Sequence, residues 1–445
     1  MNTPMILLKT LDKAKGLKVY PWYRFFQNTL SWQRDQVEVY QAERLQKLIE
    51  YALNTVPYYR AEWNRLGIRP HDIKTPSDLK KCSILDRDTL RNKQEELISS
   101  YFPLKNMHKG SSSGTTGIPI NYYTDTDGLS AGMAAGYALW NMSGWNPGQS
   151  NVHIWGNQTS IKRWNTIPSK LKNLLFHQKN IASTLLNDPE QIPELAERIV
   201  RFNPRSIDGY SSSIYDFARY CQEEKIHLKN LKQVLTTAEN LEPYQQKLIE
   251  QILAPTGDLY GSGEVLGMAA RPVNDDRYYV LDPHVILETE ASEISGMKNL
   301  LITDLNNYGM PMIRYRIGDM VDELHEPEPQ AKFPFAWFKK IQGRSSDIIT
   351  LPNGKKIHPV NIFGGTLFRR FPQITRHKVV WNGTFLEFIF EAKEKPDAKE
   401  LHRQLSVLLH PFEVPFSIEY KDRILPSSNG KYKYLEIIPK KTVTP

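Results

Sequence analysis

Residues 111–119 read Ser-Ser-Ser-Gly-Thr-Thr-Gly-Ile-Pro, and this is the most informative stretch of the 445-residue chain. Its two glycines allow close approach and unusual backbone angles, and its five hydroxyl groups crowd a single turn. Amides and hydroxyls on such a loop suit an anion with several oxygens, such as a polyphosphate. The stretch has neither the Lys-Ser or Lys-Thr pair of a P-loop nor the glycine spacing of a dinucleotide site. A solvated surface loop has the same composition, so the rest of the chain must decide.

Downstream of this loop, short apolar strands alternate with helical patterns, which is typical of a parallel sheet covered by helices. The strands are expected at Val152–Trp155, Ser206–Gly209, Val234–Thr237 and Asp258–Tyr260, and the helices at 127–143, 189–201, Ser211–Glu224 and Pro243–Leu253. After about residue 278 the pattern changes to successive strands at Tyr278–Leu281, Val285–Glu288, Leu300–Asp304 and Met312–Tyr315. The predicted fold class is therefore α/β, with layered α/β subdomains and a β-rich subdomain.

A smaller unit begins near Gly343. It has a helical pattern near 359–370 and at 397–409, and strand patterns near 377–391 and 416–422. About 100 residues are enough for an independent domain. We predict a large N-terminal domain, residues 1–343, and a small, mobile α+β C-terminal domain, residues 344–445, which carries Lys431.

The composition excludes several classes of protein. The chain has no run of about 18 apolar residues, so a membrane-spanning helix is not expected. Cys82 and Cys221 are too few for a disulfide framework or a zinc cluster, which fits a cytoplasmic protein. The net charge of +8 favours anionic partners, but the lysines are dispersed, and no nucleic-acid-binding pattern occurs. The segment Lys9–Phe26 mixes basic and apolar residues, and it either docks on its own domain or makes a peripheral contact with a membrane.

Four further motifs carry groups that a nucleotide needs. Glu264 follows Tyr-Gly-Ser-Gly at the end of a predicted strand, where a carboxylate could hold Mg²⁺. Asp319, in Tyr-Arg-Ile-Gly-Asp, could accept hydrogen bonds from ribose hydroxyls. Arg344 could bridge ribose and phosphate oxygens, and Lys431, on a glycine turn, could bring positive charge to phosphates. Each motif alone is more typical of an ordinary surface turn.

The motifs SSSGTTGIP, YGSGE, YRIGD, GRSSD and NGKYK, in this order and spacing, resemble those of the adenylate-forming superfamily of acyl-CoA synthetases and related ligases. The stretch YALNTVPYYRAEWNRLGIRPHDIKTPSDLKKC, running into ILDRDTLR, resembles the phenylacetate–CoA ligase branch, which includes CapK-like proteins of capsule biosynthesis. The segments IDGYSSSIYDFARYC and LTTAENLEPYQQKLIEQIL are also similar to that branch. The resemblance covers residues 40–437, which is most of the chain.

The resemblance implies an enzyme that joins a carboxylate to AMP, releases pyrophosphate and passes the acyl group to a thiol or another nucleophile. The residues that it implies for the ATP phosphates are Ser111, Ser112, Ser113, Gly114, Thr115, Thr116 and Gly117. The residues that it implies for the adenine pocket are Ala238, Glu239, Asp258, Tyr260 and Gly261, with Ser262 beside them. It further implies Glu264 for Mg²⁺, Asp319 for the ribose, Arg344 for ribose and phosphate, and Lys431 for the adenylation transition state. The C-terminal domain is expected to rotate about Ser346–Asp347 between the two half-reactions.

The sequence departs from the family pattern in places. Ile120 follows the proline of the first loop, where a basic residue is common, and Ser346 stands where the hinge is often Asp or Lys. Lys433 could serve as the basic residue that follows the final lysine. Some relatives have a zinc site after the Tyr-Gly-x-x-Glu turn, but residues 265–300 contain no Cys, and His284 is interpreted as a turn histidine. No structural zinc is therefore predicted.

The acyl pocket is expected where the family places groups that face the carboxylate. These residues are His153, Trp155, Gly156 and Asn157, with Tyr137, Trp140 and Tyr210 as candidate walls. Aromatic residues at such spacing are more often part of a core. The sequence HIWGNQTSIKRWN is polar and basic, whereas a phenylacetate pocket should be mainly apolar. We therefore expect a polar or anionic carboxylate, such as a sugar acid or a glycan-linked intermediate.

Three functions remain open from the sequence. The first is an ATP- and Mg²⁺-dependent ligase that transfers the acyl group to CoA, or to an amine or hydroxyl acceptor in surface polysaccharide biosynthesis. The second is an adenylyltransferase that stops at the AMP adduct. The third is a non-catalytic scaffold of a polysaccharide-assembly complex, which the joint presence of Glu264, Asp319, Arg344 and Lys431 disfavours.

Overall fold

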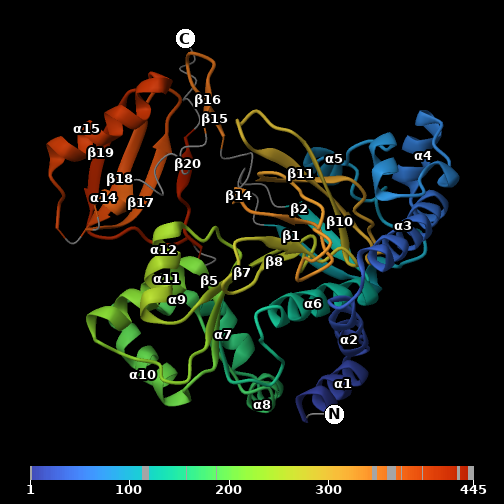
Figure 1. Cartoon of the computed structure of the whole chain (residues 1–445), viewed down its shortest axis with the longest axis horizontal. Helices are drawn as coiled ribbons and strands as arrows, with labels where there is room; N and C mark the ends of the chain where they lie inside the picture. The colour runs from blue at the N-terminus through green and yellow to red at the C-terminus, as the bar shows by residue number, and fades with distance from the viewer. Residues whose placement is uncertain are drawn as a thin grey trace.

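The computed structural model has the predicted parallel strands in the middle of an eight-stranded sheet (Figure 1). The structure describes residues 3–112, 120–156, 158–186, 188–342, 348–357, 367–371, 373–392, 394–427 and 431–438. In sheet order the strands are β13 (Trp337–Phe338), β9 (Tyr278–Val280), β8 (Ala269–Arg271), β7 (Thr256–Tyr260), β6 (Gln233–Thr237), β5 (Ser206–Tyr210), β3 (Asn151–Ile154) and β4 (Gln178–Ile181). The strands from β7 to β4 are parallel, and β8, β9 and β13 continue the sheet in antiparallel pairs.

Helices between the parallel strands bury an apolar face against the sheet. They are α9 (Ser183–Leu186), α10 (Ile192–Phe202), α11 (Ser211–Glu223) and α12 (Pro243–Ile252). Leu195 and Ile199 of α10 are buried at helical spacing, and Phe217 of α11 is fully buried. These side chains share one core cluster with Ile207 of β5 and Val234 of β6. Because each helix connects two parallel strands, the strands all end at the same edge of the sheet.

A second core cluster joins α6 (Thr126–Asn141) to the two N-terminal helices, α1 (Thr3–Lys15) and α2 (Val19–Thr29). Small residues on α6, among them Ala131 and Ala135, allow α2 to pack closely and to bury Tyr23 and Phe26. The apolar residues of the N-terminal segment are thus largely used in packing on its own domain. Among the helices of the described ranges, none is both long and apolar enough to cross a membrane.

The strand-rich region forms a separate antiparallel sheet. Its strands are β10 (Val285–Ala291), β11 (Lys298–Asp304), β12 (Tyr315–Val321) and β14 (Ile341–Gln342). The prediction of a strand at Met312–Tyr315 is wrong. Arg314 has a left-handed conformation with a φ of 51°, so the strand begins only at Tyr315. Asp319 therefore lies inside a strand rather than at the end of one.

Further N-terminal elements surround this sheet. The helices are α3 (Arg34–Thr55), α4 (Pro57–Leu66) and α5 (Arg87–Asn92), with short turns η1 (Pro70–Asp72), η2 (Pro76–Lys81) and η3 (Leu104–Asn106). Helix α3 ends before Pro57, which begins the next helix. The glycine-rich loop connects β1 (His108–Ser112) to β2 (Ile120–Thr124), which pair as a hairpin. Residues 113–119 of that loop lie outside the described residues.

The C-terminal part has its own core and its own mixed sheet, drawn in red in Figure 1. The strands, in sheet order, are β19 (Phe416–Lys421), β18 (Leu386–Ala392), β17 (Ile374–Trp381) and β20 (Leu435–Ile437). Also present are β15 (Ile349–Thr350), β16 (Lys356–Ile357), α14 (Leu367–Arg370), α15 (Ala398–Leu409) and η5 (His410–Phe412). The helix predicted at 397–409 corresponds to α15. The boundary at 343–344, Arg344 and the hinge Ser346–Asp347 lie outside the described residues and remain predictions.

Polar contacts join the C-terminal part to α11 and α12. Arg376 of β17 forms an ion pair with Asp216 of α11 and another, at 3.1 Å, with Glu391 of β18. Gln245 of α12 donates a hydrogen bond to the Tyr434 hydroxyl at 3.3 Å. Burial raises the pKa of Asp216, against the opposing charge of Arg376. A buried ion pair of this kind fixes the relative position of the two parts more than it stabilises either one.

The two cysteines of the chain lie in different parts of the N-terminal region. Cys82 follows η2 and Cys221 lies on α11, and both are buried and form no disulfide. Burial raises the pKa of each thiol to about 12. Both thiols are therefore protonated at neutral pH and shielded from reagents in the folded protein.

Candidate active site

The carboxyl ends of the parallel strands meet along one edge of the eight-stranded sheet, and several of the predicted site residues lie there. Trp155 and Gly156 follow β3, Tyr210 ends β5, Ala238 follows β6, and Tyr260 ends β7. In an open parallel sheet, ligands bind at this edge. Ala238 has a left-handed conformation with a φ of 68°, a local strain that is typical of functional sites.

Lys431 reaches this edge from the C-terminal part. Its Nζ donates a hydrogen bond to the Ala238 carbonyl oxygen at 3.1 Å and lies 5.4 Å from the centre of the Tyr210 ring. The following residue, Tyr432, donates its backbone N–H to Oε1 of Glu239 at 3.1 Å. Lys431 therefore contacts Ala238 and Tyr210, which are predicted for the adenine and acyl pockets, and its neighbour Tyr432 contacts Glu239.

Glu239 is held on its other side by the start of α11. Its Oε2 accepts hydrogen bonds from the backbone N–H of Ser212 at 3.0 Å and from the Ser212 hydroxyl at 2.5 Å. Burial raises the pKa of Glu239, and the hydrogen bonds from Ser212 and Tyr432 and the charge of Lys431 oppose that rise. The carboxylate thus connects the sheet edge, α11 and the C-terminal part.

Asp258 lies in the interior of β7. Its two oxygens accept hydrogen bonds from the hydroxyls of Thr236 and Tyr278, each at 2.6 Å. Burial raises the pKa of Asp258, and the charge of Arg271 opposes the rise. Because both carboxylate oxygens are occupied, Asp258 can fix the position of β7 behind a nucleotide pocket but has little capacity left for a direct contact.

A second polar group surrounds Glu264 and Asp319. The Tyr260 hydroxyl donates to Oδ2 of Asp319 at 2.8 Å, which joins the end of β7 to β12. Arg87 of α5 donates to the carbonyl oxygen of Ile317 at 3.3 Å, and its Nη1 lies 3.8 Å from Oε1 of Glu264. Arg87 therefore contacts both Glu264, which is predicted for the metal, and strand β12, which carries Asp319, the residue predicted for the ribose.

The Glu264 carboxylate is suited to a cation. Glu264 is only 6% exposed, and within the described ranges its Oε1 has no hydrogen-bond partner. Ser262 closes the turn before it by accepting a hydrogen bond from the Val265 backbone N–H at 3.0 Å. A buried carboxylate oxygen without a partner is costly, and a hard cation such as Mg²⁺ would satisfy it. The described residues contain no group of three or more His, Cys, Asp or Glu side chains that could hold a metal by themselves.

The stem of the glycine-rich loop is packed beside this carboxylate by Tyr122 of β2. A Cβ atom on Gly110 would lie 2.1 Å from Cζ of Tyr122, and one on Gly263 would lie 2.6 Å from its hydroxyl. A side chain at either position would therefore require the Tyr122 ring to move. Burial, and after it the nearby charge of Glu264, raise the pKa of Tyr122 to about 12. Ser111 on β1 is exposed, and the backbone of Ser112 pairs with Ile120.

The predicted acyl pocket has a polar group at its base. Nδ1 of His153 lies 2.5 Å from Oδ2 of Asp208, which is 1% exposed, and Asn151 donates to the other oxygen of Asp208. The His153 ring stacks on Trp155, with 5.6 Å between the ring centres, and Trp155 lies 4.5 Å from Tyr210. Because Asp208 accepts from Nδ1, the Nε2 atom of His153 is the one left for a ligand.

The other candidate walls lie deeper. Tyr137 and Trp140 of α6 pack with Trp145, at 5.4 and 5.1 Å between ring centres. The pKa of Tyr137 is raised by burial and then by the charge of Asp208, so Tyr137 lies between the core and the His153 group. Asn157, predicted beside the carboxylate, lies outside the described residues, as do Ser113, Gly114, Thr115, Thr116, Gly117 and Arg344.

His284 is a buried histidine with both ring nitrogens in use. Its Nε2 lies 2.9 Å from the Leu266 carbonyl oxygen, and its Nδ1 lies 2.8 Å from the amide nitrogen of Asn306. Burial lowers its pKa, so the ring is neutral. This arrangement gives His284 a structural role next to the turn that carries Glu264.

Sequence reasoning missed three residues that the structure brings to the site: Arg87, Tyr122 and Asp208. Arg87 lies in the stretch ILDRDTLR, which the sequence analysis quoted without giving any residue of it a role. Asp208 precedes Gly209 in a predicted strand. A carboxylate is rare in a buried strand, and this could have marked Asp208 as a candidate site residue. Nothing in the sequence indicated a role for Tyr122, because that role depends on Gly110 and Gly263, which are far apart in the sequence.

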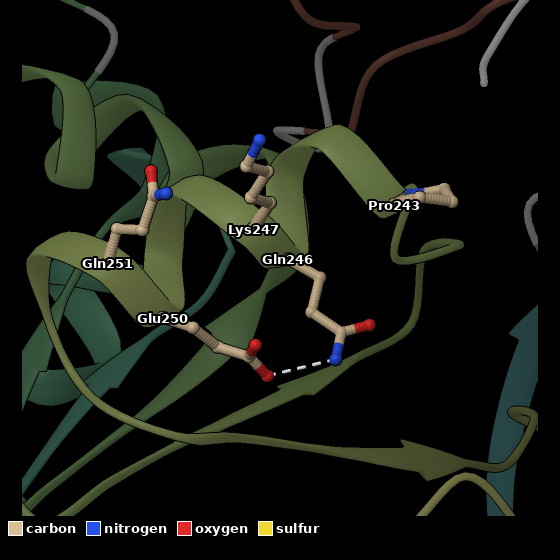
Figure 2. Close-up of a pocket in the computed structure, with 5 residues that line it drawn as sticks. All are labelled: Pro243, Gln246, Lys247, Glu250 and Gln251. Atoms are coloured by element: carbon tan, nitrogen blue, oxygen red, sulfur yellow. Dashed lines mark hydrogen bonds between the residues drawn. The ribbon is translucent and has the colours of Figure 1, made fainter. Parts of the chain in front are cut away.

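A shallow surface hollow lies on α12, away from this edge (Figure 2). It is lined by Pro243, Gln246, Lys247, Glu250 and Gln251, and Gln246 donates to Glu250 at 2.9 Å. None of the predicted site residues contributes to it. We therefore assign the candidate site to the sheet edge and not to this hollow.

The chain is similar in sequence to several known proteins. No protein-family model matches the chain. Protein CapK of Staphylococcus aureus is 22% identical over 320 residues, which cover 69% of this chain and 68% of that protein. The phenylacetate-coenzyme A ligase of Aromatoleum evansii is 26% identical over 351 residues, 74% of this chain and 75% of that protein.

Solved structures share the fold. A 2-hydroxyisobutyryl-CoA ligase in the postadenylation state, in complex with R3-HIB-AMP, superposes with a TM-score of 0.69 at 18% identity and covers 91% of this chain and 89% of its own. The same ligase with 2-HIB-AMP and CoA, in the thioesterification state, gives a TM-score of 0.58 at 17% identity and covers 91% and 90%. The chain is thus similar in sequence to CapK and to phenylacetate-coenzyme A ligases, and it shares the fold of the 2-hydroxyisobutyryl-CoA ligase.

Proposed function

We propose that the protein is an ATP-dependent, AMP-forming ligase that activates a carboxylate as acyl-AMP and transfers the acyl group to CoA. The observation that carries this proposal is the contact of Lys431 with Ala238 and the Tyr210 ring at the carboxyl edge of the sheet. A lysine brought from a separate part of the chain to a nucleotide edge is what adenylation requires. Negative charge moves there from the α-phosphate to the leaving pyrophosphate, and a cation stabilises it.

Different residues of this chain would bind the adenine, the ribose and the phosphates of ATP. Ala238 and Glu239 would border the adenine, Asp319 would accept hydrogen bonds from the ribose hydroxyls, and the loop 111–117 with Arg344 would hold the phosphates. The hydrogen bond from the Tyr260 hydroxyl to Asp319 supports the ribose role. It holds one carboxylate oxygen in place and so fixes the orientation of the other.

Mg²⁺ fits the site through Glu264. Among the described residues, the buried Oε1 accepts no hydrogen bond, which supports this assignment, and its ion pair with Arg87 at 3.8 Å would balance the carboxylate in the absence of a cation. When bound, the cation would neutralise phosphate charge. The protein itself would orient the phosphates and exclude water from them.

We further propose that the acid is polar or anionic. The His153–Asp208 pair supports this, because a histidine with a charged partner is unfavourable beside an aromatic or fatty acyl group and favourable beside a hydroxyl or a second carboxylate. A sugar acid of surface polysaccharide biosynthesis is one acid of this kind, and the resemblance of the sequence motifs to capsule-biosynthesis proteins suggests it. CoA is the proposed acceptor because phenylacetate-coenzyme A ligases are among the sequence relatives.

ATP–pyrophosphate exchange across a panel of aryl, fatty, amino and sugar acids tests the activity. We expect exchange with a polar acid, and we expect Lys431→Ala to reduce it by about 100- to 1000-fold. The matched control is Lys421→Ala, which removes an exposed lysine of the same C-terminal part that pairs only weakly with Glu419, at 3.4 Å.

The outcomes separate the alternatives. Exchange that persists in Lys431→Ala, or no exchange with any acid, would contradict the proposal and favour a scaffold. A stable AMP adduct that no thiol resolves would identify an adenylyltransferase. Exchange with phenylacetate or fatty acids only would leave the ligase assignment intact and refute the polar substrate.

A further inference from the structure

Helix α8 (Ile167–Leu175) has its apolar side turned outward. Ile167 is 82% exposed, Leu171 55%, Leu174 71% and Leu175 43%, and none of the residues of the helix is buried. In a soluble domain, a helix with this pattern normally buries its leucines. We refer to Ile167, Leu171, Leu174 and Leu175 as the α8 face.

The four residues form one continuous stripe. Their spacing, i, i+4, i+7 and i+8, puts them on the same side of a helix. Lys170 and Lys172 are exposed at the two margins of the stripe, and the partly buried Ser169 and Asn173 lie on the opposite side. The helix is thus amphipathic, but its polar side faces its own protein.

The surrounding charge is of one sign. Residues 128–187 contain no Asp or Glu, whereas Lys162, Arg163, Lys170, Lys172 and Lys179 all lie between β3 and α9. A run of 60 residues without an acidic side chain is unusual in a chain with 49 acidic residues. An anionic partner would therefore meet no repulsion from this stretch.

The N-terminal helix also carries exposed basic groups. Phe176, which follows α8, packs against the same core cluster as Leu8 of α1, and Figure 1 shows α8 and α1 at the same end of the molecule. On α1, Lys9 and Lys13 are exposed, whereas the carboxylate of Asp12 is buried and accepts a hydrogen bond from the Tyr20 backbone N–H at 2.6 Å. The acidic group of the helix is thus turned inward and the basic groups outward.

We propose that the α8 face docks the protein on an anionic lipid surface. Lysine is depleted at protein–protein interfaces, whereas lysines at the margins of an apolar stripe are favourable at a membrane, where their stems cover acyl chains and their charges meet the head groups. The apolar residues enter the head-group boundary, and each exposed lysine near it adds to the attraction. A single short helix gives reversible attachment. This proposal extends beyond the proposed ligase activity and does not depend on it.

Co-sedimentation of the full chain with vesicles tests the proposal. Vesicles of phosphatidylcholine and phosphatidylglycerol in equal amounts should bind the wild-type protein, and vesicles of phosphatidylcholine alone should bind it at least about tenfold less. The double variant Leu171→Ser/Leu174→Ser and the double variant Lys170→Glu/Lys172→Glu should each reduce binding to the anionic vesicles about tenfold or more. The control is Val407→Ser, because Val407 is 60% exposed on α15, in the C-terminal part.

Two results would overturn the proposal. One is equal binding of the wild type and both α8 variants to anionic vesicles. The other is absence of binding together with a dimer, seen by light scattering, that the leucine variant converts to a monomer, because a second copy would then cover the face. The leucine variant should retain its thermal unfolding midpoint, since Leu171 and Leu174 are each more than half exposed. ATP–pyrophosphate exchange measured alongside keeps the ligase proposal separately testable.

Discussion

At the scale of single residues, Asp208 controls the proposed substrate-binding histidine without touching the substrate. Its oxygen lies 2.5 Å from Nδ1 of His153, so it holds the proton on that nitrogen and presents Nε2 to the pocket. We expect Asp208→Asn to reduce kcat/KM for the acid by roughly tenfold while the KM for ATP stays unchanged. Nitrogen-15 NMR of labelled histidine should show a changed tautomer ratio for His153.

The control for Asp208→Asn is Asp276→Asn, an exposed carboxylate that pairs with Lys339 at 2.7 Å. It should change neither readout. An unaltered tautomer in Asp208→Asn, with activity reduced all the same, would show that Asp208 acts on the fold and not on His153.

Glu264 provides a second prediction for a single residue. Glu264→Gln keeps the volume of the side chain but removes the charge from a carboxylate whose Oε1 is buried. The Mg²⁺ concentration for half-maximal pyrophosphate exchange should rise by about tenfold or more. Glu250→Gln, on the outer side of α12, is the matched control. A Mg²⁺ dependence that is the same in both variants would refute the metal role of Glu264.

The sheet edge that carries much of the candidate site could be predicted from the sequence, because the alternation of strands with helices is visible in the apolar pattern. The expected roles of Ala238, Glu239, Asp258 and Tyr260 came instead from the resemblance to the family. The contacts of Asp258 with Thr236 and Tyr278 depend on neighbouring strands and could not be predicted. The same holds for Arg87, which approaches Glu264 only because α5 packs on β12.

At the scale of elements, β5 depends on one glycine. Gly209 has a φ of 149°, and a Cβ there would lie 2.0 Å from the Ile154 backbone oxygen of the neighbouring strand β3. Neither backbone can move without breaking the parallel ladder. We expect Gly209→Ala to lower the free energy of unfolding by about 2–4 kcal/mol, measured by urea denaturation.

Gly136→Ala serves as the comparison. Gly136 lies within α6, and a Cβ there would meet nothing within 4 Å, so alanine should be neutral or slightly stabilising. If both variants lost the same stability, the close approach of β5 to β3 would not be the cause.

The elements also show why prediction from sequence was incomplete. Strands β5, β6 and β7 were recognised as short stretches between helical patterns, with apolar residues such as Ile207, Val234 and Leu259, and most of their residues are buried. The strand at Met312–Tyr315 was misplaced because those residues are equally apolar, whereas the left-handed Arg314 that interrupts them has no sequence signal. Helix α8 was not predicted at all. Its pattern gives the side on which the leucines lie but not whether protein or solvent covers them.

At the scale of the whole molecule, the ion pair between Arg376 and Asp216 joins the C-terminal part to α11. Domain rotation after adenylation would have to break it. We expect Asp216→Asn to reduce pyrophosphate exchange by about tenfold, because it weakens the arrangement in which Lys431 contacts Ala238. Thioester formation from supplied acyl-AMP, measured in a single turnover, should be unchanged or faster.

Glu223→Gln, at the other end of the same helix, is the control, since Glu223 pairs with Arg219 at 3.9 Å and is half exposed. It should leave both half-reactions unchanged. Equal loss of both half-reactions in Asp216→Asn would indicate general damage to α11 and would contradict a role in domain position.

The buried cysteines make the chain convenient for following such a rotation directly. Cys82 and Cys221 are the two cysteines of the sequence, and both thiols are protonated and covered in the folded protein. A cysteine introduced on the outer side of α15, together with one on α12, would therefore accept a pair of fluorescent dyes with no prior removal of native thiols. Energy transfer between the dyes would then report the distance between the two parts during turnover, one molecule at a time.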